Sequence, residues 1–348
     1  MQINELLQAW GRILSGRAPL LSIEITRECP LRCPGCYAYE DEHVGGVNLR
    51  SLADFKGEEL VARVLALVDE HKPLHLSLVG GDPLVRYREL NVLLPQLAQR
   101  GIYVQVVTSA FRPIPLSWAG IPNLRISVSV DGLQPEHDTR RKPATYDKIL
   151  RNIRGHHVAI HCTITSAMVK PGYLREFVAF WSNNDAVEKI WMSMFTPQRH
   201  ANPIECPTSL QRLIAVEELL QLGKEFPKLY MPETMLREFL APPASPRQCI
   251  FARTTLTLSA DLKSKIEPCQ FGGDPDCSRC GCAASMGLAA VGNTKLVGPL
   301  KARHFLQASL AVGKVWQRAR SLGGKNGTGR GTPDSASEHG DELVRIAS

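Results

Sequence analysis

Three cysteines near the start of the chain are spaced closely enough to bind metal as one unit. Cys29, Cys33 and Cys36 form a C-x3-C-x2-C array in ITRECPLRCPGCYAY, directly after the apolar run 20–26. Three thiolates from one loop can bind three irons of a [4Fe–4S] cluster, which leaves the fourth iron open for a substrate or cofactor. A zinc loop is the alternative, but it would need a fourth ligand nearby and more often uses C-x2-C pairs. The position after a first strand favours the iron–sulfur interpretation.

A second group of cysteines lies towards the C-terminus. The segment CIFARTTLTLSADLKSKIEPCQFGGDPDCSRCGC contains Cys249 and Cys269, followed by a C-x2-C-x-C run of Cys277, Cys280 and Cys282. TLTLSAD and SKIEPC predict two short strands joined by a turn, with the first two cysteines at opposite ends of this hairpin. Five thiols suffice for one cluster of four ligands and not for two. A structural zinc ribbon is the alternative.

The remaining composition narrows the class of protein. The chain has 348 residues, of which 44% are hydrophobic and 22% charged, and its formal net charge is +7. The basic residues are scattered, so we expect no nucleic-acid partner. We expect no transmembrane segment, since no apolar run approaches the roughly 20 residues that a membrane helix needs. Clustered thiols without an export signal predict metal chemistry in the cytoplasm. Cys162 is interpreted as a buried small hydrophobic residue, and Cys206 has no visible partner.

Alternating strand and helix patterns must position the first cysteine loop. Six runs rich in Val, Ile and Thr predict strands at 20–26, 74–80, 102–109, 124–131, 158–165 and 188–195. Amphipathic helical patterns lie between most of them. This alternation predicts an α/β fold with a parallel sheet, and six units predict a partial (β/α)6 barrel similar to a TIM barrel. Sites in such sheets lie at the C-terminal ends of the strands.

The chain is expected to divide into a core and several appended segments. The N-terminal segment predicts an amphipathic helix whose apolar face carries Leu6, Leu7, Trp10, Ile13 and Leu14. The expected divisions are an N-terminal helix (1–19), a core (20–200), a helical linker (201–246), a cysteine-rich domain (247–300), a helix (301–320) and a disordered tail (321–348).

Further motifs follow the cysteine array in the order found in one enzyme superfamily. Gly80, Gly81, Asp82 and Pro83 end the second predicted strand as GGDP. Together with the C-x3-C-x2-C array, this segment resembles the radical S-adenosylmethionine (SAM) superfamily, whose GGEP motif contacts the SAM ammonium. Glycines allow close backbone approach, and a carboxylate can accept from a cation, although Asp shortens the reach by one methylene. Gly35 stands where the family often has an aromatic residue, so we transfer a backbone contact to adenine and no stacking role for Tyr37.

The fourth predicted strand completes the resemblance. SVSVDG is followed by HDTRR, which resembles family members with additional C-terminal clusters. The resemblance implies that Ser129 and Asp131 meet polar groups of SAM and that Arg141 holds its carboxylate in a bidentate contact. Thr108 and Ser109 are weaker candidates for the same site.

The resemblance implies a specific activity. A radical SAM enzyme reductively cleaves SAM to a 5′-deoxyadenosyl radical, which abstracts hydrogen from a substrate, and it receives its electron from a donor such as flavodoxin or ferredoxin. The second cysteine group resembles the twitch or SPASM extension of the family, which implies an auxiliary [4Fe–4S] cluster on Cys249, Cys269, Cys277 and Cys280. Ser264 replaces the usual Gly of that pattern.

The substrate is less well indicated by the sequence. We expect a small molecule, because no domain that would recognise a leader peptide is visible before residue 20. A peptide- or protein-modifying maturase of the same superfamily is the first alternative. A non-catalytic iron–sulfur or zinc protein is the second.

Overall fold

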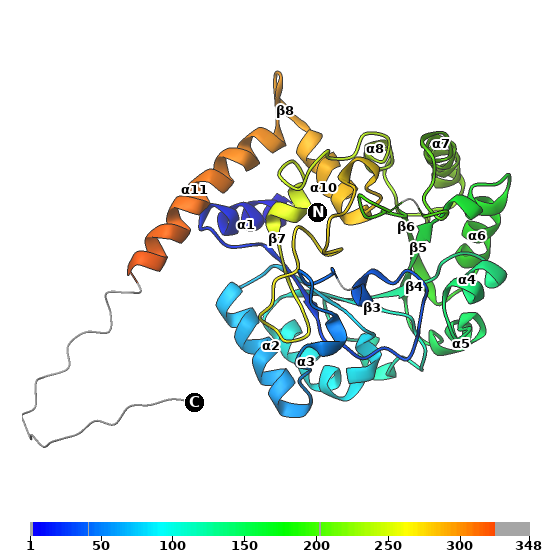
Figure 1. Cartoon of the computed structure of the whole chain (residues 1–348), viewed down its shortest axis with the longest axis horizontal. Helices are drawn as coiled ribbons and strands as arrows, with labels where there is room; N and C mark the ends of the chain where they lie inside the picture. The colour runs from blue at the N-terminus through cyan, green and yellow to red at the C-terminus, as the bar shows by residue number, and fades with distance from the viewer. Residues whose placement is uncertain (1–2, 41, 202, 324–348) are drawn as a thin grey trace, which may run out of the picture.

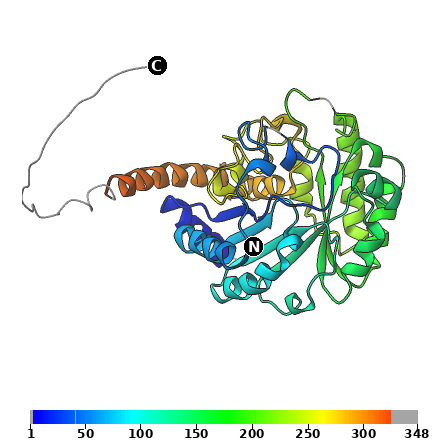
Figure 2. The same cartoon turned by 60° about the horizontal axis from the view of Figure 1, so that its bottom comes forward.

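The computed structural model describes residues 3–40, 42–201 and 203–323, and its centre is a seven-stranded parallel sheet. The strand order is β6-β5-β4-β3-β2-β1-β7, so the sheet is open and has two edges. Figures 1 and 2 show the sheet curved, with helices on its outer side. The strands are β1 (Leu20–Glu24), β2 (His75–Val79), β3 (Tyr103–Thr108), β4 (Leu124–Ser129), β5 (Val158–Ile164), β6 (Val187–Met194) and β7 (Thr255–Leu258).

The predicted α/β class and partial barrel are confirmed. Each of the six predicted strands forms, and neighbours along the chain pair in parallel register, as in Leu21↔Leu76 and Val106↔Ile126. The residues that face the helices, such as Leu76 and Val106, are buried and apolar, whereas the other face of the sheet lines a cavity and carries polar residues such as Ser77 and Gln105.

The seventh strand differs from the expected C-terminal hairpin. β7 pairs in parallel with β1, from Leu20↔Thr255 to Ile23↔Leu258. The second half of the expected hairpin contributes a single antiparallel bridge, Leu258↔Lys265. The local pattern predicted a strand correctly but gave no sign of its partner, because strand pairing between distant segments leaves no local periodicity.

Helices cover the outer face of the sheet and extend the molecule at one end. The main helices are α2 (Gly57–His71), α3 (Tyr87–Gln99), α4 (Gln134–Arg140), α5 (Tyr146–Asn152), α6 (Tyr173–Ser182) and α7 (Ser209–Glu225). The C-terminal part adds α8 (Glu233–Glu238), α9 (Ile250–Thr254), α10 (Ala283–Asn293), a small β8–β9 hairpin (Lys295–Val297 and Leu300–Lys301) and α11 (Ala302–Gly323). Short 3₁₀ turns include η1 (Tyr37–Tyr39), η2 (Leu49–Ser51), η3 (Pro83–Arg86) and η6 (Cys277–Arg279).

The predicted N-terminal helix forms as α1 (Ile3–Leu14) and lies beside α11 (Figure 1). Trp10 donates a hydrogen bond to Ser309 and packs edge-on against Phe305. Ile13 is buried, while Leu7 and Leu14 are exposed, so only part of the predicted apolar face is covered. Within the described residues, no helix combines the length and apolar character needed to cross a bilayer. Of the expected tail, residues 321–323 continue α11, and 324–348 lie outside the described residues.

Candidate active site

The first cysteine loop lies directly against the glycine turn that ends β2. Gly80 and Gly81 have φ angles of +78° and +37°, which side-chain-bearing residues rarely adopt. A Cβ on Gly81 would lie 2.2 Å from the carbonyl oxygen of Glu28, and a Cβ on Gly80 would lie 2.2 Å from the Cβ of Glu24. The Asp82 amide also donates to the Glu28 carbonyl at 2.9 Å. Only glycine therefore allows this turn to approach the residue that precedes Cys29.

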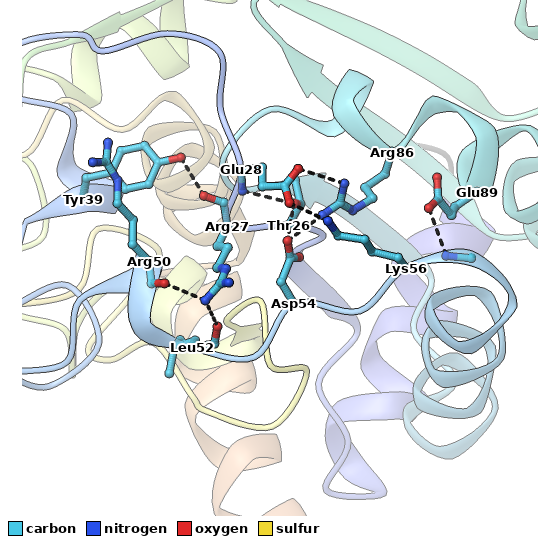
Figure 3. Close-up of polar contacts among 11 residues, drawn as sticks. Thr26, Arg27, Glu28, Tyr39, Arg50, Leu52, Asp54, Lys56, Arg86 and Glu89 are labelled. Carbon is cyan, nitrogen blue, oxygen red and sulfur yellow. Dashed lines mark hydrogen bonds and ion pairs between the residues drawn. The ribbon is translucent and has the colours of Figure 1, made fainter.

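Ion pairs fix the same loop from its other side (Figure 3). Arg86, in η3, contacts Asp54 at 2.5 Å and Glu28 at 3.1 Å, and Lys56 contacts Glu28 at 2.8 Å. The hydrogen bond from Arg86, followed by that from Lys56, lowers the pKa of Glu28 to about 2. Thr26 donates to Asp54 at 3.2 Å. The turn after β2 and the cysteine loop are thus linked through charged side chains as well as through the backbone.

The carboxylate of Asp82 is already fully engaged within the protein. It is buried, and its oxygens accept from the Thr108 hydroxyl at 2.6 Å, the Ser109 amide at 2.8 Å, the Ser109 hydroxyl at 2.5 Å and the Leu84 amide at 3.0 Å. A carboxylate has about four acceptor sites, so these bonds use its capacity. Burial raises the pKa of Asp82. The predicted contact of this side chain with the SAM ammonium stays a prediction, and it would require one of these bonds to be exchanged.

A buried carboxylate and two arginines meet beyond the end of β4. Arg141 donates from Nε to Asp131 at 2.7 Å, and Arg140 lies 3.4 Å from the same oxygen and 3.2 Å from Glu205. Burial opposes ionisation of Asp131, but the charges of Arg141 and Arg140 outweigh it and lower its pKa to about 2. His137, which the sequence motif gave no role, accepts from the Asp131 amide at 3.1 Å.

A cavity of about 1490 Å³ joins these features. Its lining includes the three cysteines of the first loop and most of the predicted cofactor residues: Cys29, Cys33, Gly35, Cys36, Gly80, Gly81, Asp82, Ser129, Asp131 and Arg141. Thr108 and Ser109 also line it, whereas Pro83 is buried at the start of η3 and is not among the lining residues. The structure therefore brings together residues from the ends of β1, β2, β3 and β4.

Comparison with known proteins identifies the family to which this arrangement belongs. Residues 23–179 match the model of the radical SAM superfamily, and this segment contains the cysteine array, the GGDP turn and Arg141. Residues 23–179 therefore form a domain of the radical SAM superfamily. Membership implies a [4Fe–4S] cluster and SAM as cofactors.

Two curated relatives have names that describe a reaction or a pathway. The chain is 23% identical over 283 residues to a probable GTP 3′,8-cyclase of Methanosarcina mazei, covering 76% of this chain and 80% of the relative. It is 32% identical over 130 residues to molybdenum cofactor biosynthesis protein 1 of Drosophila melanogaster, covering 35% of this chain and only 22% of that protein.

Solved structures share the fold at low sequence identity. Native anSMEcpe with bound AdoMet superposes with a TM-score of 0.53 at 14% identity, covering 88% of this chain and 99% of that chain. SuiB of Streptococcus suis bound to the precursor peptide SuiA gives a TM-score of 0.54 at 13% identity. That match covers 74% of this chain and 61% of SuiB.

A buried acid–imidazole pair connects the radical SAM domain with the C-terminal cysteine segment. The Glu24 carboxylate contacts Nε2 of His43 at 2.7 Å and accepts from the Ser259 hydroxyl at 2.6 Å. Nδ1 of His43 lies 3.0 Å from the carbonyl oxygen of Phe271, and the Tyr37 ring packs against both His43 and Phe271. Sequence reasoning missed this network. The only local signal was an acid within the apolar strand 20–26, since a buried charge requires a partner.

The five C-terminal cysteines lie close together. Beyond the larger effect of burial, the neighbouring thiols Cys280, Cys249 and Cys277 raise the pKa of Cys269, and Cys280, Cys269 and Cys249 act on Cys282 in the same way. Burial raises the pKa of Cys269 to about 12 and that of Cys277 to about 11. Cys282 also lines the cavity, where Nε2 of Gln270 lies 3.4 Å from its sulfur.

The donor set of the first loop consists of thiolates, which suit the iron–sulfur cluster that the family implies. All ten cysteines are free thiols. Among the described residues, no three or more His, Cys, Asp or Glu side chains converge on a point suited to one metal ion. In a [4Fe–4S] cube each thiolate binds a different iron, so the ligands are spread around the cluster. Cys29, Cys33 and Cys36 line one cavity and influence one another electrostatically, as ligands of one cube would.

Proposed function

We propose that this chain is a radical SAM enzyme that acts on a small molecule and carries one auxiliary [4Fe–4S] cluster. When bound, the catalytic cluster and SAM supply a 5′-deoxyadenosyl radical that abstracts hydrogen from the substrate. The observation that carries the proposal is that the cysteines of the first loop line the same cavity as Gly80–Gly81, Ser129 and Arg141.

The residues around this cavity would divide the work of holding the cofactors. Cys29, Cys33 and Cys36 would hold the catalytic cluster. The backbone of Gly80 and Gly81 allows close approach, since neither carries a Cβ. Asp131 already occupies Nε of Arg141 and keeps the guanidinium charged and oriented, which suits it to a carboxylate.

Four C-terminal thiols support an auxiliary cluster of the twitch type. Cys249, Cys269, Cys277 and Cys280 would provide the four ligands that one cluster needs, and Cys282 is set apart from them because it lines the cavity. A reducing compartment such as the cytoplasm and a one-electron donor such as flavodoxin or ferredoxin belong to the same proposal.

The relative named as a GTP cyclase suggests one specific substrate, but the cavity gives limited support for a triphosphate. Among the described residues that line it, the Lys and Arg side chains are Arg125, Arg140 and Arg141. Arg140 and Arg141 are paired with Asp131, and Arg140 also with Glu205. A triphosphate would need several cations that are not already neutralised.

Anaerobic reconstitution tests the proposal. The wild-type chain is expected to bind close to eight irons, since each cube holds four, and to form 5′-deoxyadenosine from SAM when reduced. Replacing Cys29, Cys33 and Cys36 together by Ala should abolish 5′-deoxyadenosine formation while the auxiliary cluster signal persists in electron paramagnetic resonance. Ser117→Ala, at an exposed position outside the cavity lining, is the control and should change neither quantity. Full 5′-deoxyadenosine formation by the triple variant would reject the proposal.

A further inference from the structure

The cavity extends far beyond the residues that would hold the cofactors. Its volume of about 1490 Å³ includes the space that the cluster and SAM would occupy and exceeds the roughly 300–1,000 Å³ of a site for one small molecule. Leu124 and Ser129, the first and last residues of β4, both line it. Five steps along a strand, at about 3.3 Å each, correspond to a length of roughly 16 Å. The cavity continues past both ends, to Asp131 near the cysteine loop and to Trp10 and Leu306 at the far end.

Two chemically different walls face each other across this space. The sheet contributes a polar side chain from each of six neighbouring strands: Ser22, Ser77, Gln105, Ser127, His161 and Ser193. The opposite wall comes from α10, where Ala284, Gly287, Leu288 and Val291 follow the i, i+3, i+4, i+7 spacing of one helical face. Ile250 and Phe251 of α9 extend this apolar wall.

The far end of the cavity lies between helices that carry exposed apolar side chains. Trp10 of α1 and Leu306 of α11 line the cavity there. On the outer parts of the same helices, Leu7, Val315 and Trp316 are each about 60% exposed or more, at 59%, 67% and 59%. An apolar molecule that reaches the cavity by this route would remain in contact with apolar surface as it enters.

We propose that the ligand of the far part of the cavity, and hence the substrate of the proposed radical SAM reaction, is an elongated amphipathic lipid. Its hydrocarbon body lies on α10 and its polar groups face the strands, because burying apolar surface is favourable and buried polar groups need partners. The scarcity of unpaired cations in the lining disfavours a nucleoside triphosphate. The inference rests on the proposed function only in calling this lipid a substrate.

Equilibrium dialysis of radiolabelled palmitate against the reconstituted full chain, with SAM and without reductant, tests the inference. We expect saturable binding by the wild-type chain. Ala284→Trp fills the space beside the exposed Ala284 and should weaken binding about tenfold or more. Ala62→Trp makes the same replacement at an exposed position of α2 outside the cavity lining, and should leave the affinity unchanged. Leu288→Asn, which adds a polar group to the apolar wall without adding volume, gives an independent result and should also weaken binding.

Three results would overturn the inference. The first is that palmitate shows no saturable binding, and the second is that Ala284→Trp and Leu288→Asn both bind palmitate as tightly as the wild-type chain. The third is that GTP displaces palmitate. Failure of the proposed function is a different observation. Palmitate binding that persists in a chain unable to cleave SAM would reject the radical SAM activity and leave the lipid site in place.

Discussion

Replacing Arg86 by Met should destabilise the chain strongly, because it leaves a buried carboxylate without its partner. Arg86 and Asp54 lie 2.5 Å apart, and their side chains are only 5% and 3% exposed. Removing one member of a buried ion pair costs about 3–5 kcal/mol. The second pair, with Glu28, contributes less, since Glu28 is 42% exposed and pairs of that kind contribute roughly 0–1 kcal/mol. The loss should therefore be about 3–5 kcal/mol, and most of it should come from Asp54.

Urea unfolding of the reduced, metal-free chain measures this loss. Arg86→Met combined with Asp54→Asn should recover most of the stability, because replacing both charges removes the uncompensated one. Arg88→Met, two residues further along at an exposed position, should change the free energy of unfolding by no more than about 0.5 kcal/mol. Since Glu28 precedes Cys29, Arg86→Met should also lower the iron bound by the first loop. A free energy of unfolding within about 1 kcal/mol of wild type, or a double variant less stable than Arg86→Met, would refute the reasoning.

Three further predictions concern the site. Cys282→Ala should retain the iron content of the reconstituted wild-type chain, whereas Cys280→Ala should lose the auxiliary cluster; the opposite order in iron analysis would assign the ligand role to Cys282. Folding lowers the pKa of Asp131 from 3.8 to about 2. Ionised Asp131 therefore adds about 2 kcal/mol to the free energy of unfolding above about pH 4, and this stabilisation is lost as the pH falls towards about 2. Urea unfolding over that pH range should show this loss in the wild-type chain and not in Asp131→Asn. Equal slopes of the free energy of unfolding against pH in the two chains would contradict the prediction. Gly81→Ala should lower the free energy of unfolding by more than about 2 kcal/mol, because the new Cβ would lie 2.2 Å from a backbone oxygen. Gly45 also has a positive φ, +63° against +37° at Gly81, but open space around it, so an equal loss of stability in Gly45→Ala would show that the contact is not the cause.

The sequence predicted the six central strands because each is a compact run of β-branched and apolar residues. Such a pattern is local, and the buried face of each strand displays it clearly. It also located the residues that meet at the cavity, since the C-terminal ends of neighbouring parallel strands share one edge. Cys29, Gly81 and Arg141 come together for this reason.

Contacts between distant segments were beyond the reach of the same reasoning. His43 meets Glu24 and the carbonyl of Phe271, and neither partner can be recognised from the residues around His43. Three of the four bonds that Asp82 accepts also depend on the fold, because Thr108 ends the next strand and Ser109 follows it. The sequence predicted residues that approach the site but could not determine which of them were already satisfied by other protein groups.

The pairing of β7 with β1 has a consequence for synthesis of the chain on the ribosome. β1 is made early, and its neighbour on one side, β2, follows soon after, but its other neighbour is not made until residues 255–258. Until then the nascent chain presents an unpaired strand edge, which can pair wrongly with other chains. The Glu24 carboxylate also lacks its Ser259 partner during that interval. A chain released after the sixth strand would therefore retain an aggregation-prone edge, and we expect chaperone dependence to decrease sharply once the C-terminal segment has emerged.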